Sequence, residues 1–136
     1  MRKKKKPNLE YRLFILPAFD EVRRKHSTLF RLETVKEFST FNYEIVMDTK
    51  VADRKIIWNI HGLRSPAMSL PHFGAATFTR HYEDLRGKYE FMITKLDGAE
   101  NAFTLNLTEQ KVTVTKSPRQ RFIEILTSAK FITPTT

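Results

Sequence analysis

The residue types best suited to hold a ligand gather in one irregular stretch, residues 61–76. Two of the six prolines and two of the four glycines lie in it, a composition typical of a connection rather than a strand. Long connections between strands often carry binding residues. The alternative is a crossover between two sheets whose apolar residues pack into the core. If the stretch binds a ligand or partner, we expect the contacts at His61, Arg64, Met68, His72 and Phe73.

The same stretch raises the question of a metal site. Imidazole and thioether groups together favour copper, and His61, Met68, His72 and His81 supply both kinds of ligand. Their spacing does not follow a known metal motif, and His61 lies eleven positions before His72. We therefore predict no metal and no other cofactor.

Residues for covalent or acid–base catalysis are poorly arranged in this sequence. No Gly-x-Ser-x-Gly elbow surrounds Ser65 or Ser69. Glu83 and Asp84 are adjacent, so on a strand their carboxylates point to opposite faces. The four glycines do not cluster into a phosphate-binding loop, and the absence of cysteine removes thiolate chemistry. We predict that the protein is not an enzyme.

Basic residues are concentrated at two places in a chain of net charge +9. One is the N-terminal run and the other is the turn at residues 116–121, and both could contact phosphates without reading a sequence. The remaining Lys and Arg residues are scattered among Asp and Glu, so the alternative is a solvated tail and a solvated turn. The candidate polyanion-binding residues are Arg2, Lys3, Lys4, Lys5, Lys6, Lys116, Arg119 and Arg121.

The elements that must position these residues follow a period of two. In Lys88–Thr94 and again in Phe103–Thr108, apolar residues alternate with polar ones, as in a half-buried strand. The Asp97-Gly98 pair between them is a strong turn signal, so we predict a hairpin.

Similar alternation marks further strands along the chain. A short helix is predicted only at Ala18–His26, because Pro17 suits a helix start and Phe19 and Val22 are three residues apart. The other predicted strands are Glu10–Leu16, Leu29–Lys36, Asn42–Asp48, Lys55–Leu63, Thr77–Leu85, Lys111–Thr115 and Arg121–Thr127.

One segment, Tyr82–Phe91, resembles the corner between two strands in fibronectin type III and related immunoglobulin-like domains. Leu85 and Gly87 there precede a strand that opens with the aromatic residue Tyr89. Glycine permits the tight reversal, and a tyrosine can bury its ring while its hydroxyl reaches the backbone. The resemblance implies a β-sandwich and implies no activity.

These patterns predict an all-β fold. We expect one antiparallel β-sandwich of the immunoglobulin or fibronectin III type, with about eight or nine strands and at most one short helix. The alternative is a small up-and-down β-barrel. Residues 1–8 are predicted to form a basic flexible arm, residues 9–132 a single β domain, and residues 133–136 a frayed C-terminus.

The N-terminal residues do not match a secretory signal. After the basic run, Pro7, Asn8, Glu10 and Arg12 interrupt the apolar stretch that such a signal needs. No stretch approaches the roughly 18 apolar residues of a membrane span. We therefore expect a soluble, cytoplasmic protein.

Taken together, the sequence favours a non-enzymatic binding or protein-interaction module. Its surfaces would be the connection at residues 61–76 or the strand edges, and its partner another protein or a small ligand. Two alternatives stay open: polyanion or nucleic-acid binding through the N-terminal arm and the turn at residues 116–121, and a small barrel that holds an apolar ligand.

Overall fold

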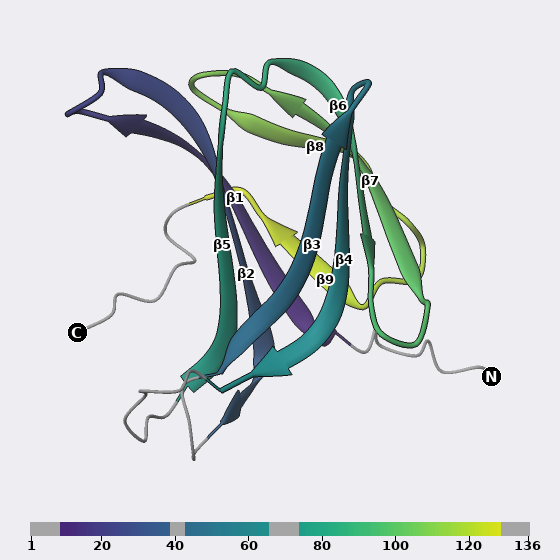
Figure 1. Cartoon of the computed structure of the whole chain (residues 1–136). Coiled ribbons are helices and arrows are strands. Elements are labelled where there is room, and N and C mark those ends of the chain that lie inside the picture. The colour runs from purple at the N-terminus through teal and green to yellow at the C-terminus, as the bar shows by residue number, and fades with distance from the viewer. Residues whose placement is uncertain (1–8, 39–42, 66–73, 129–136) are drawn as a thin grey trace.

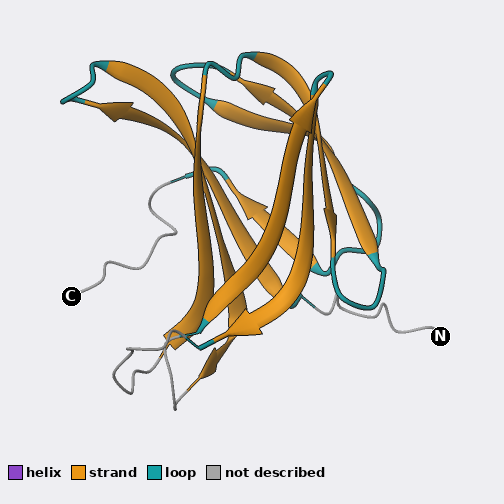
Figure 2. Ribbon diagram, in the orientation of Figure 1, coloured by secondary structure: helices purple, strands orange, loops and turns teal. Residues whose placement is uncertain are grey.

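Nine strands and no helix make up the part of the chain that the computed structural model describes, residues 9–38, 43–65 and 74–128 (Figures 1 and 2). No helix long and apolar enough to cross a membrane therefore occurs in these ranges. The predicted arm and the predicted frayed C-terminus lie outside them. The strands are β1 (Tyr11–Asp20), β2 (Lys25–Phe38), β3 (Glu44–Ala52), β4 (Lys55–Arg64), β5 (Gly74–Glu83), β6 (Gly87–Thr94), β7 (Glu100–Leu107), β8 (Val112–Lys116) and β9 (Ile123–Leu126).

All nine strands belong to one mixed sheet, in the order β8-β7-β6-β4-β3-β5-β2-β1-β9. Most neighbours are antiparallel, whereas β4 with β6, β1 with β9 and a short β3–β5 contact are parallel. The sheet curls into a nearly closed barrel (Figure 1). The all-β prediction is confirmed, but the two-sheet sandwich is wrong. The barrel is not of the up-and-down type either, because strands adjacent in the sheet are often not consecutive in the chain.

In the best-defined strands, the alternation in the sequence correctly predicts which side chains are buried. In β4, Ile56, Trp58 and Ile60 are buried, and in β6, Phe91 and Ile93 are buried. The predicted β6–β7 hairpin is confirmed, with its turn closed by the hydrogen bond that the Lys95 N–H donates to the Ala99 carbonyl. These strands are half-buried, as a period of two requires.

The predicted helix at residues 18–26 is wrong, because that segment forms the tip of the β1–β2 hairpin. The turn at the tip is held by the Asp20 carboxylate, which accepts hydrogen bonds from the backbone N–H groups of Val22 and Arg23. Pro17 lies within β1, past Phe14, where the pairing with β9 ends. Of the described strands, only β2 flanks β1 there, and strands tolerate proline at such an edge.

The corner that resembles fibronectin type III joins β5 to β6. Gly87 has a φ of +90°, so the reversal does use the glycine as expected. However, the two strands that the corner joins belong to the same sheet and are not neighbours in it. The sandwich implied by the resemblance is therefore not formed.

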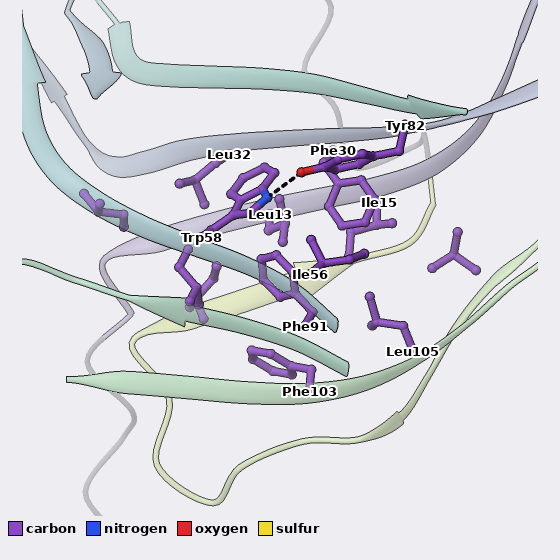
Figure 3. Packing of buried hydrophobic residues seen from close by; sticks show 14 of the residues in the cluster. Leu13, Ile15, Phe30, Leu32, Ile56, Trp58, Tyr82, Phe91, Phe103 and Leu105 are labelled. Carbon is purple, nitrogen blue, oxygen red and sulfur yellow. Dashed lines mark hydrogen bonds between the residues drawn. The ribbon is translucent and has the colours of Figure 1, made fainter. Parts of the chain in front are cut away.

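Aromatic rings fill the centre of the barrel (Figure 3). Phe30 contacts the rings of Trp58, Tyr82 and Phe91 at centroid distances of 5.2–5.8 Å. The buried indole Nε1 of Trp58 donates a hydrogen bond of 3.0 Å to the Tyr82 hydroxyl. The core thus combines dense ring packing with a satisfied polar pair.

The ring of strands is interrupted at two places. At the first, which we call the split, β3 and β5 share a single residue pair, Glu44 with Thr77, and then diverge (Figure 1). At the second, which we call the seam, the outermost strands β8 and β9 do not pair with each other.

Side chains close the seam. Asn101 in β7 is 4% exposed; its amide donates to the Gln120 carbonyl at 3.0 Å and its carbonyl accepts from the Phe122 N–H at 2.9 Å. Lys95 forms an ion pair with Glu10 and lies 5.1 Å from the centre of the Phe122 ring. The hydrogen bond with Glu10 is the main reason that the pKa of Lys95 is raised above its ordinary value.

Candidate functional site

An open groove of about 900 Å³ lies on the outside of the barrel. Its walls are the β3–β4 turn, the first residues of β6, part of β7 and the segment that follows β8. We call it the basic groove, because four cationic side chains line it. They are Arg54, Lys55, Lys88 and Lys116.

The local backbone explains how the first two cations reach the groove. Asp53 and Arg54 have φ values of +50° and +64°, as the two central residues of a type I′ hairpin turn require. The turn places Lys55 at the start of β4, in register with Glu90 of β6. The Glu90 N–H also donates a hydrogen bond of 2.9 Å to the Arg54 carbonyl, which ties the turn to β6.

The other two cations come from strands on the far wall. Lys88 is exposed on the outward face of β6, while the neighbouring Tyr89 points inward. Lys116 ends β8 and is in register with Thr104 of β7, an outward-facing residue. The groove therefore collects charges from three separate parts of the chain.

Arg54 is the most firmly positioned of the four cations. Its guanidinium carbon lies 4.9 Å from the centre of the Tyr89 ring, and its Nη1 donates a hydrogen bond to the Arg86 carbonyl. A cation over an aromatic face is electrostatically favourable, and the hydrogen bond restricts the long side chain further. Arg54 thus holds its charge against the Tyr89 ring, on the inward side of β6, with little conformational freedom left to lose on binding.

The groove carries an excess of positive charge. None of its four cations forms an ion pair with a carboxylate in the described part of the chain, and they outnumber the two carboxylates on its walls, Asp53 and Glu90. Four other arginines in the described residues do pair with carboxylates, among them Arg64 with Glu44 and Arg86 with Glu109. Unpaired cations around a concave surface raise the local concentration of anions.

One of the predicted polyanion-binding residues lies at the basic groove. Lys116 lines the basic groove, whereas Arg119 and Arg121 do not, although they follow it closely in the chain. The five basic residues of the predicted arm, Arg2–Lys6, lie outside the described residues.

The predicted binding connection at residues 61–76 is described only at its two ends. His61 contacts the Asp48 carboxylate at 2.6 Å, and Arg64 pairs with Glu44 at 2.8 Å. Both side chains are therefore already engaged on the barrel surface. The predicted contacts Met68, His72 and Phe73 lie outside the described residues.

Sequence reasoning missed Arg54, Lys55, Lys88 and Tyr89. A weak signal existed, since Asp53-Arg54-Lys55 is a charged turn between two predicted strands. What the sequence could not show is that this turn lies beside the start of β6 and the end of β8. Within the described ranges, no group of three or more His, Asp or Glu residues is placed to hold a metal ion.

Comparisons with known proteins leave the site to be judged on its own geometry. The chain matches no protein-family model, no curated protein sequence and no solved structure. The arrangement of charge and ring in the basic groove is therefore the observation from which a function has to be argued.

Proposed function

We propose that the protein is a non-enzymatic binding module that holds a phosphate-bearing polyanion, such as single-stranded nucleic acid, in the basic groove. The observation that carries this proposal is the convergence of four cations on one groove of about 900 Å³, none of them paired with a carboxylate among the described residues. Electrostatic attraction of this kind needs no base-specific contact.

The chemistry of the individual residues supports a phosphate ligand. The guanidinium of Arg54 is held against Tyr89, and a planar guanidinium suits the paired oxygens of a phosphate. Lys55, Lys88 and Lys116 add mobile point charges along the walls. A strand of nucleic acid needs such a series of charges, because each phosphate carries one negative charge.

The turn at residues 116–121 fits the same proposal as an extension of the groove. Lys116 belongs to both the turn and the groove, and Arg119 and Arg121 continue the positive charge along the chain. In this scheme Arg2–Lys6 strengthen binding without adding specificity.

The other two functions considered from the sequence have less support. At the described end of the connection at residues 61–76, His61 and Arg64 already have carboxylate partners. For an apolar ligand inside the barrel, the space is taken by the contacting rings of Phe30, Trp58 and Phe91.

The test is the salt dependence of binding to a fluorescent single-stranded oligonucleotide. For single strands, the logarithm of affinity falls with the logarithm of salt concentration with a slope of about −0.7 per phosphate neutralised. The double variant Lys88→Gln/Lys116→Gln should lower the affinity and make the slope shallower by about 1.4. Arg54→Lys should weaken binding less, since it keeps the charge and loses the planar group.

A matched control removes the same charge elsewhere. Lys36 and Lys111 are exposed and form no ion pair within the described residues, and they do not line the groove. Lys36→Gln/Lys111→Gln should leave the slope nearly unchanged. Equal losses in the two double variants would contradict the groove, and deletion of residues 1–6 measures the contribution of the arm separately.

A further inference from the structure

The split leaves most of one strand edge without a partner strand. On one side, β3 pairs with β4 from Glu44 to Ala52. On its other side it meets β5 only at Glu44 and then diverges from it (Figure 1). Within the described residues, the outer edge from Val46 to Ala52 therefore offers backbone donors and acceptors that no strand uses. Such an edge is a template for another strand.

The side chains along this edge form a self-complementary pattern. Residues opposite one another in an antiparallel pair share a face of the sheet, and opposite charges there are stabilising. If a second copy of β3 pairs antiparallel about Thr49, Asp48 of each copy lies opposite Lys50 of the other. Met47 then lies opposite Val51, whose side chain is 42% exposed in the single chain.

The charges also select one register. Moving the centre of the pair to Asp48 would place two aspartates directly opposite each other, and moving it to Lys50 would do the same with two lysines. Like charges in that position are destabilising. Lys50 has no ion pair with a described carboxylate, so in the single chain its charge is uncompensated.

We propose that two copies of this chain associate through the β3 edges, antiparallel and centred on Thr49. The result is a two-fold dimer in which every contact occurs twice. The pairing extends over Val46–Ala52 only, because β5 occupies the edge at Glu44. This interface lies apart from the basic groove and does not depend on the function proposed for the groove.

The first experiment exchanges the two charges and measures molecular mass by sedimentation. The wild-type chain should be a dimer. Asp48→Lys and Lys50→Asp should each be largely monomeric at the same concentration, because like charges then face each other. An equimolar mixture of the two variants should recover dimers, because each introduced charge then faces an opposite charge in the other variant.

Two controls separate the interface from side effects. Asp48 also contacts His61 at 2.6 Å, so His61→Gln removes that contact and should leave the dimer intact. Lys111→Asp makes the same charge change on an exposed residue away from the split, and should also remain dimeric. Circular dichroism confirms that each variant is folded.

The second experiment tests the register with a cysteine in a chain that has none. Thr49→Cys places the two thiols opposite each other across the two-fold axis, at a Cα separation of about 4.5–5.5 Å that suits a disulfide. Mild oxidation should convert most of this variant to a covalent dimer. Thr79→Cys, on the exposed part of β5, should stay monomeric on denaturing gels.

Three outcomes would overturn the proposal. If the wild-type chain stays monomeric at high micromolar concentration, two copies do not associate through β3. The partner of the β3 edge is then an extended segment of another protein. If the mixture of the two folded charge variants does not recover dimers, Asp48 does not face Lys50 across the interface. A dimer that Thr49→Cys does not cross-link has its axis elsewhere.

Discussion

The seam and the split are both gaps in the same sheet, but among the described residues only the seam is closed by the chain itself. At the seam, Asn101 bonds to the backbone on both sides of Arg121, and Lys95 adds an ion pair with Glu10. At the split, side chains cover the core from within, as where the Phe78 ring contacts Trp58 at 5.1 Å. The β3 edge itself has no comparable bonds in the described residues.

The difference shows what a missing strand pair requires. A gap that would leave buried backbone groups unsatisfied has to be filled, because each such group costs about 1–3 kcal/mol. A gap at the surface can stay open, because water satisfies the backbone until a partner arrives. The seam is thus a structural closure, and the split is a surface that can take another strand.

The largest effect is expected from opening the seam. Asn101→Ala removes the hydrogen bonds to the Gln120 carbonyl and the Phe122 N–H, so the free energy of unfolding should fall by about 2–3 kcal/mol. Urea unfolding measures the loss, and hydrogen exchange should show β9 opening before β2. Asn106→Ala, on the exposed face of the same strand, should cost much less. Similar losses in the two variants would mean that Asn101 does not close the seam.

A smaller effect is expected where side chains cover the core behind the split. Tyr82→Phe leaves the buried Nε1 of Trp58 without its acceptor, so unfolding should become easier by about 1–2 kcal/mol. Trp58 is the only tryptophan, so its fluorescence reports the change directly. Tyr89→Phe is the matched control, and an equal loss there would show that the hydrogen bond adds no stability.

The smallest effect is expected from the ion pair at the seam. Lys95→Met should lower the free energy of unfolding by about 0.5–1 kcal/mol near neutral pH, since the partner Glu10 is exposed to solvent. The pKa of Lys95 is raised in the folded protein, chiefly by the hydrogen bond with Glu10.

The direction of that shift sets the pH dependence. The contribution of Lys95 is fully present below its ordinary pKa of 10.5 and is lost as the pH rises through the raised value. The stability difference between the wild type and Lys95→Met should therefore shrink above about pH 10.5. Lys88→Met, which breaks no ion pair among the described residues, should show no such convergence.

Alternation predicted most strands, because it depends only on neighbours along the chain. Phe103, Leu105 and Leu107 alternate with polar residues, so their side chains face the interior in any fold that buries one face of that strand. The same pattern arises in a sandwich and in a barrel, so it could not decide between them. The parallel pairing of Lys55 with Glu90 decides it here, and that pairing depends on how the chain crosses over in space.

The candidate site was less predictable for the same reason. Lys116 was found as part of a basic turn, but Arg54 and Lys88 look like ordinary surface residues in the sequence. Their meeting depends on the positive φ values at the β3–β4 turn and on the strand order. The prediction of a binding connection at residues 61–76 rests on composition, which does not reveal that His61 and Arg64 have carboxylate partners.

The parallel pairing of β1 with β9 has a consequence for synthesis on the ribosome. Tyr11 pairs with Ile123, so β1 cannot complete its contacts until the segment that forms β9 has emerged. Such high contact order slows folding and prolongs the exposure of unpaired apolar segments. The apolar segment Leu13–Leu16 is therefore the part of the chain that a chaperone would have to shield while translation continues.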